Sequence, residues 1–145
     1  MSYFEITRPM ESVWCLQGRR GTVSVLLQGT KQALLADTGM GVGNLADAVR
    51  KLTGLPLTVV NTHGHVDHTG GNYQFSSVYL SPKDRSILEQ GRSAQVRRRI
   101  LSMDERSVPM DFDSGAFFGP VSPEPLPLKE NMRFDLGGIS AEAVP

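Results

Sequence analysis

The six-residue run His63-Gly64-His65-Val66-Asp67-His68 holds all three histidines of the chain together with one carboxylate. Imidazole nitrogens bind zinc, iron and related metals, and a neighbouring carboxylate is more typical of hydrolytic centres than of thiolate cages. The spacing therefore predicts a centre for one or two divalent metal ions, with His63, His65, Asp67 and His68 as candidate ligands. Zinc is the first expectation, and iron or manganese are alternatives.

A buried strand is expected to carry this motif. Leu57–Asn61 is a short, apolar, β-branched run that precedes it directly. If the chain stays extended, alternate side chains project to one side and the last histidine rejoins them at a turn, in the order His63, His65, Asp67 and His68. Gly64 and the Gly70-Gly71 pair are expected to let the backbone turn sharply around the ions.

Two segments resemble a known family, the metallo-β-lactamase superfamily. His63–His68 is similar to its His-x-His-x-Asp-His signature, and Thr69-Gly70-Gly71-Asn72 follows as in many members. Upstream, Leu34-Leu35-Ala36-Asp37-Thr38-Gly39 resembles the family strand that ends in Asp-Thr-Gly. The resemblance extends in motif order from about Thr22 to the end of the chain.

By this resemblance, His63 and His65 bind a first metal, and Asp67 and His68 bind a second. The resemblance also implies that Asp37 supports the site without being a primary ligand, since a ligating histidine usually donates its other N–H to a carboxylate or carbonyl. A simple turn position at the end of a strand is the competing interpretation of Asp37.

The family pattern is only half present. In the family another histidine ligand follows a strand resembling Ile139–Pro145, and a bridging aspartate and a last histidine lie further on. We therefore expect residues 1–145 to be a single, incomplete domain in which each metal has two protein ligands, whereas a catalytic zinc generally has three. Asp113, Asp135 or Glu142 could substitute, but their spacing does not distinguish them from solvated carboxylates.

The resemblance implies hydrolysis of a small-molecule substrate. Metal-bound hydroxide would attack an ester, thioester, lactone, amide or phosphoester bond, with Asp67 orienting the water or binding the second metal. His68 directly after Asp67 is more similar to glyoxalase II and other di-metal hydrolases than to β-lactamases that carry another residue there. The alternative is a catalytically incomplete or truncated metal-binding fragment that needs a second half.

Charge and composition exclude some partners. Fifteen basic and fifteen acidic residues give zero formal charge, so nucleic acids and anionic membranes are not attracted globally. Arg97–Arg99 suggest an RNA-processing nuclease as a third function, but a helix spreads consecutive residues into a broad solvated arc.

The single Cys15 cannot form an internal disulfide and is expected in the core. With no signal peptide or membrane-spanning run, we expect a cytoplasmic protein.

Pattern and turn signals predict an α/β fold. Strands are expected at 12–16, 22–28, 32–36, 57–61 and 77–80, and a final hairpin at 132–144 turns at Gly137-Gly138. Helices are expected from the Asn44 cap to about Thr53, from Pro82 to about Gln90, and over 93–103. The segment 109–127 holds five of the nine prolines and is predicted to be a long loop. Its aromatic residues either pin it to the core or line a substrate pocket: Phe112, Phe117 and Phe118.

We predict a mixed sheet with helices on one face, equivalent to the first half of the family's αββα sandwich. The opposite face would expose apolar side chains, at a cost of roughly 25 cal/mol per Å². Self-association or a complementing second-half chain is therefore expected.

Overall fold

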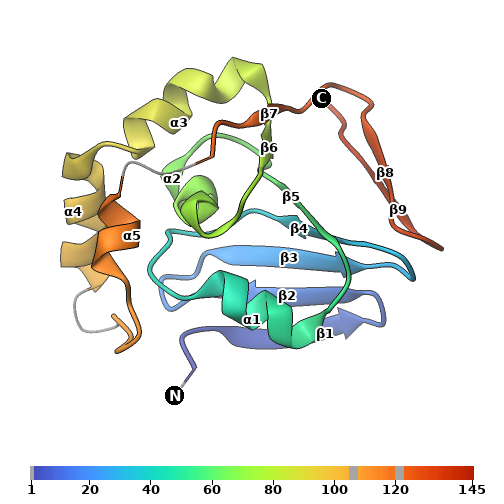
Figure 1. The fold of residues 1–145 in the computed structure, drawn as a ribbon, viewed down its shortest axis with the longest axis horizontal. Coiled ribbons are helices and arrows are strands. Elements are labelled where there is room, and N and C mark those ends of the chain that lie inside the picture. Colours follow the sequence, from blue (N-terminus) through green and yellow to red (C-terminus); the bar gives the residue numbers. More distant parts are fainter. Residues whose placement is uncertain (1, 105–107, 120–122) are drawn as a thin grey trace.

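The computed structural model describes residues 2–104, 108–119 and 123–145. Figure 1 shows a mixed sheet whose seven strands follow the order β1-β2-β3-β4-β5-β6-β7. They are β1 (Glu5–Met10), β2 (Val13–Gln17), β3 (Val23–Gln28), β4 (Ala33–Ala36), β5 (Leu57–Val60), β6 (Tyr79–Leu80) and β7 (Leu126–Pro127). The pairs from β1 to β4 are antiparallel, and those from β4 to β7 are parallel. A separate hairpin joins β8 (Arg133–Asp135) to β9 (Ser140–Glu142).

Helices connect the parallel strands. They are α1 (Leu45–Leu52), α2 (Val66–Thr69), α3 (Arg85–Gly91), α4 (Ala94–Asp104) and α5 (Ser114–Phe118), with 3-10 turns η1 (Asn72–Gln74) and η2 (Pro82–Asp84). Asn44 caps α1 as predicted, since its side chain accepts a hydrogen bond from the Asp47 N–H. The α/β fold with a mixed sheet is confirmed. Within the described ranges, no helix is both long and apolar enough to cross a bilayer.

The main core lies between α1 and one face of the sheet. Leu45 and Val49 on α1 pack with the buried sheet residues Leu16, Leu26, Leu35 and Val59. Fully burying side chains of this size contributes about 1.5–3 kcal/mol each. A second cluster, formed by Val42, Ile100 and Phe117, holds α4 and α5 against the loops beyond the sheet.

The opposite face of the sheet is only partly covered. Its side chains Val13, Val25, Leu27 and Val60 are half-buried, and Val23 is 41% exposed. The β8–β9 hairpin leans over one part of this face, with the Phe134 and Tyr79 ring centroids 5.4 Å apart. A groove of about 310 Å³ separates the hairpin from β3, β4 and β5. The predicted open apolar face is therefore present.

The segment 109–127 is more regular than predicted. Asp113 caps α5 by accepting a hydrogen bond from the Ala116 N–H at 2.9 Å, and Phe117 is buried. Strand β7 then pairs with β6, where Leu126 N donates to Val78 O at 2.8 Å. Proline is tolerated there because β7 is an edge strand. Burial of Phe117 pins the segment to the core, and residues 120–122 lie outside the described ranges.

Strand β1 was not predicted from the sequence. All of its residues are exposed and it contains Pro9, so it lacks the alternation of apolar and polar residues that marks a half-buried strand. Its pairing with β2, for example Ile6 opposite Leu16, places it at the edge of the sheet.

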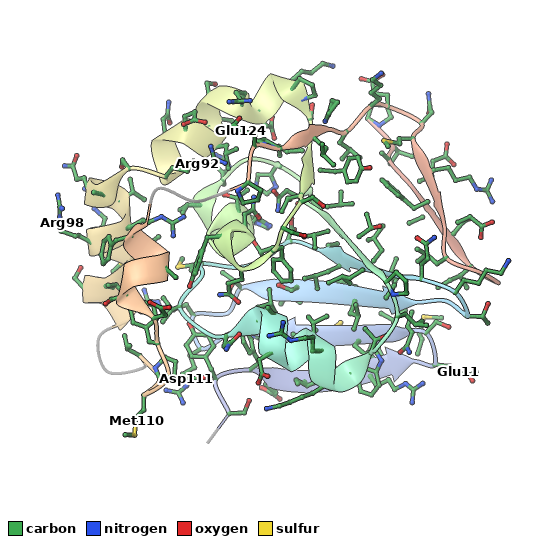
Figure 2. The ribbon with its side chains drawn as sticks, viewed as in Figure 1. Glu11, Arg92, Arg98, Met110, Asp111 and Glu124 are labelled. Atoms are coloured by element: carbon green, nitrogen blue, oxygen red, sulfur yellow. The ribbon has the colours of Figure 1, made fainter. Side chains whose placement is uncertain are left out.

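Arg97 does not belong to a solvated arc, and that prediction was wrong for this residue. Arg97 is only 6% exposed, and its guanidinium lies 4.7 Å from the Phe117 ring centroid and 5.7 Å from that of Tyr73. One of its N–H groups donates to the Gly70 carbonyl at 3.3 Å. Burial lowers the pKa of Arg97 below its ordinary value. Figure 2 shows that Arg98, by contrast, points away from α4.

Candidate metal centre

The candidate site lies at the carboxyl ends of two neighbouring parallel strands. Asp37 follows β4, and its backbone N–H donates to the Val60 carbonyl at the end of β5 at 2.8 Å. The histidine motif begins three residues after β5, at His63. Ligands of open α/β sheets commonly bind at this edge. The parallel half of the sheet therefore brings both sequence motifs to one place.

The motif was predicted to be extended through Asp67, and this prediction was wrong, because the chain is helical from Val66 onward. His65 has extended backbone angles, φ −63° and ψ 147°, and is the N-cap of α2. Asp67 and His68 lie within this helix, where the His68 N–H donates to the His65 carbonyl at 2.9 Å. A single helical turn turns Asp67 and His68 back toward His63.

Three of the four predicted ligands converge. The ligand atoms of His63, Asp67 and His68 all lie within 4.8 Å of one another, and His68 Nε2 is 3.5 Å from Asp67 Oδ2. His65 is exposed and outside this group, although its ring centroid is 4.9 Å from that of His63. Zinc bonds to nitrogen and oxygen are about 2.0–2.2 Å, so two ligands of one ion lie at most about 4.4 Å apart. The three residues fit a divalent ion after a small closure.

Asp37 makes hydrogen bonds to both Thr62 and His68 at the site. Its Oδ1 accepts from the Thr62 N–H at 2.7 Å, and its Oδ2 accepts from the Thr62 hydroxyl at 2.8 Å. The same Oδ2 lies 2.8 Å from His68 Nδ1. Asp37 is 6% exposed and has a φ of 67°, a left-handed conformation that short polar residues adopt more readily than others.

These contacts define the tautomers of two histidines. An ionised carboxylate only accepts hydrogen bonds, so His68 Nδ1 must carry the proton that it donates to Asp37. The Thr62 hydroxyl gives its proton to Asp37, so its oxygen accepts from His63 Nδ1 at 3.1 Å. In the neutral form of each ring, Nε2 is therefore the nitrogen without a proton. An unprotonated nitrogen is what a metal ion requires.

A buried polar network fixes the backbone of His68. Its carbonyl accepts from the Thr38 N–H at 2.8 Å and from Asn61 Nδ2 at 3.1 Å. Asn61 and Asn72 exchange amide hydrogen bonds of 2.8 and 3.1 Å, and the Thr38 hydroxyl donates to Asn72 Oδ1 at 2.8 Å. All three side chains are at most 2% exposed, and such buried polar groups are almost always paired. The sequence analysis placed both asparagines in motifs but assigned neither amide a role.

The glycines of the motif serve close packing rather than turning. Among the described residues, Gly64, Gly70 and Gly71 are not in the positive-φ group. A Cβ on Gly70 would lie 2.4 Å from the Met40 carbonyl oxygen, and one on Gly71 would lie 2.3 Å from that of Thr38. Only a residue without a side chain allows the loop after β4 to approach α2 this closely.

This fold and this site define a class of protein. The chain belongs to the metallo-beta-lactamase superfamily, whose family model matches residues 17–129. The superfamily membership predicted from the two motifs is confirmed.

Particular relatives can also be named. The human and bovine proteins called acyl-coenzyme A thioesterase MBLAC2 are each 33% identical to it, over 46% of this chain and 28% of their own length. BJP-1, a subclass B3 metallo-beta-lactamase of Bradyrhizobium japonicum, matches 99% of this chain and 52% of its own with a TM-score of 0.62 and 22% identity. A metallo-beta-lactamase of Cronobacter sakazakii matches 99% of this chain and 53% of its own, with a TM-score of 0.62 and 18% identity. At these identities the two lactamases support the fold alone. The chain spans about half the length of the lactamases and less than a third of the thioesterases.

Proposed function

We propose that this chain carries the metal centre of a hydrolase, in which His63, His65, Asp67 and His68 hold one or two divalent ions, with zinc first. The convergence of His63, Asp67 and His68 carries this proposal. The support comes from the donor set of imidazole and carboxylate, and from two histidines whose hydrogen bonds leave Nε2 free.

When bound, a divalent metal lowers the pKa of a coordinated water toward neutrality and so supplies hydroxide as a nucleophile. The residues of this chain prepare that chemistry. Asp37 holds the proton on His68 Nδ1 directly and the proton on His63 Nδ1 through Thr62. The Asp67 carboxylate, which is 45% exposed and 3.5 Å from His68 Nε2, would ligate an ion or accept a hydrogen bond from the attacking water.

The proposed substrates contain an ester, thioester, lactone, amide or phosphoester bond. Thioesters come first, since the thioesterases named above share a third of their matched residues with this chain. An acyl-coenzyme A panel of increasing chain length, assayed beside ester, lactone, amide and phosphoester substrates, tests this order directly.

Metal content tests the proposal first. The purified chain should hold near-stoichiometric zinc, iron or manganese by elemental analysis, and His63→Ala and Asp67→Ala should lose it. Asp111→Ala is the matched control, because Asp111 is an exposed carboxylate in the loop before α5 (Figure 2). A wild-type chain that retains no metal after purification with zinc would contradict the proposal.

A second candidate is a metal-binding fragment that requires a complementary half. The half-buried apolar face opposite α1 favours this candidate. We propose that a second copy or a second-half chain covers this face. Light scattering should then show a dimer at micromolar concentration, and a strictly monomeric chain would count against self-association.

Two finer proposals complete this assignment. The free thiol of Cys15 supports a reducing compartment, such as the cytoplasm. An RNA-processing role has less support, because burial of Arg97 removes one member of the arginine cluster from the surface. Salt-dependent RNA binding that is lost on charge reversal of Arg98 and Arg99 would restore that role.

A further inference from the structure

Asp84 uses its carboxylate in an unusual way for its position. It ends η2 and occupies the N-cap of α3, where an aspartate normally accepts a hydrogen bond from its own helix, a contact worth about 1 kcal/mol. Its side chain makes no such bond. Instead, Asp84 Oδ2 accepts from the backbone N–H of Gly64 at 2.8 Å. The carboxylate therefore contacts the histidine motif rather than its own helix.

Gly64 lies directly against the start of α3. A Cβ at this position would be 2.7 Å from the Asp84 carbonyl oxygen and 3.2 Å from Ile87 Cβ. At the other end of the helix, a Cβ on Gly91 would be 3.0 Å from Val66 Cβ. Helix α3 thus contacts the motif on both sides of His65, at Gly64 and at Val66.

The N–H of Gly64 belongs to the peptide that links His63 to Gly64, and Gly64 is the only residue between the two histidines. Rotation of this peptide would change the direction of the His63 side chain relative to that of His65. The ring centroids of these two histidines are 4.9 Å apart. The hydrogen bonds of Asp37 fix the proton positions of His63 and His68, but among the described residues they do not reach this peptide. A separate constraint is needed for it.

We propose that Asp84 is a positioning residue of the metal centre, which fixes the His63–Gly64 peptide through the Gly64 N–H and so sets the geometry of the His63 and His65 pair. The inference rests on the proposed metal-binding function. Asp84 acts through Gly64 and is not itself a ligand. The competing interpretation is that Asp84 contributes only to the stability of the start of α3.

Three variants separate these interpretations. Asp84→Ala removes the acceptor, whereas Asp84→Asn keeps an oxygen that can accept from Gly64. Ser81→Ala is the matched control, because the Ser81 hydroxyl accepts from the Lys83 N–H at 3.3 Å at the start of η2 and this bond is local to the turn. Ser81→Ala should weaken this turn without touching the motif.

Two readouts are needed for each variant. The first is zinc affinity by chelator competition, together with the visible absorption spectrum of the cobalt-loaded chain. The second is hydrogen exchange of the Gly64 amide in the metal-free chain, measured by NMR. We expect Asp84→Ala to weaken zinc binding by about tenfold or more, to alter the cobalt spectrum and to remove protection of the Gly64 amide. Asp84→Asn should stay within about threefold of wild type, and Ser81→Ala should keep both properties.

The metal-free readout separates the failure of this inference from that of the proposed function. A wild-type chain with a protected Gly64 amide but no zinc affinity would refute the proposed function alone. Unchanged zinc affinity and cobalt spectrum in a folded Asp84→Ala variant would overturn the positioning role. An unprotected Gly64 amide in the wild-type chain, or an equal loss of affinity in Ser81→Ala, would overturn it as well.

Discussion

Replacing Asp37 with asparagine should reverse the proton position of His68. In the variant, Oδ1 can still accept the hydrogen bond from the Thr62 N–H, which is 2.7 Å long in the wild-type structure. The amide NH₂ would take the place of Oδ2 and face His68 Nδ1 across 2.8 Å, so two donors would meet. His68 relieves this by moving its proton to Nε2, the nitrogen that a metal would bind.

The expected loss of metal affinity follows from the role of Asp37 as the hydrogen-bonding partner that orients His68. Altering a partner that orients a metal-ligating histidine typically lowers metal affinity 10–100-fold, which corresponds to about 1.4–2.7 kcal/mol. Asparagine tolerates the φ of 67° at this position, so the fold should survive. Asp37→Ala should be worse, since alanine adds about 1–2 kcal/mol of left-handed backbone strain and leaves donors unpaired.

Chelator competition measures the affinity, and long-range ¹H–¹⁵N correlation spectra of the metal-free chain report the histidine tautomers. Asp135→Asn is the matched control, because Asp135 is an exposed aspartate that accepts from the Gly137 N–H at 3.0 Å in the hairpin turn. If folded Asp37→Asn binds zinc as tightly as wild type with His68 still protonated on Nδ1, the assignment of Asp37 is wrong.

Three other perturbations test the surroundings of the site. Asn72→Ala should lower the free energy of unfolding by about 3 kcal/mol in urea titrations, because it removes three buried hydrogen bonds to Asn61 and Thr38. Burial raises the pKa of Tyr73 above its ordinary 10.0, so the stability it contributes is complete below pH 10 and is lost as the pH rises through the raised value; Tyr73→Phe should show a flatter stability profile there. No carboxylate pairs with Arg97 among the described residues, so Arg97→Met should change the unfolding free energy by less than about 1 kcal/mol or raise it. Arg97→Ala should lower the unfolding free energy by about 2–3 kcal/mol, because it also removes the packing of the side chain. A large loss of stability in Arg97→Met would mean that the hydrogen bond to Gly70 matters more than burial of the charge.

Local signals in the sequence predicted the elements that follow local rules. Three such elements lie where predicted, because their signal comes from the residues themselves. They are the Asn44 cap of α1, the β-branched run of β5 and the Gly137-Gly138 turn. Strand β1 was missed because edge strands need not alternate. Helix α5 was missed because its cap, Asp113, stands in a segment dominated by prolines.

The partners of the site could not be predicted, because they are distant in the sequence. Asp84 meets Gly64 across 20 residues, and Arg97 meets Gly70 across 27. Nothing in the spacing around either residue indicates such a contact. Asn72 offered a weak signal, since it directly follows the glycine pair. The ligand candidates themselves were recognisable because four of them lie within six positions.

The attachment of His68 to two strands has a consequence for how a metal would bind. Its carbonyl is held by Thr38 after β4 and by Asn61 after β5, so its backbone can move only if those strands move. Metal uptake should therefore require little ordering of the chain, in contrast to zinc fingers, where binding and folding are one event. Calorimetry should accordingly show a small heat-capacity change on zinc binding, and circular dichroism should show the same secondary structure before and after.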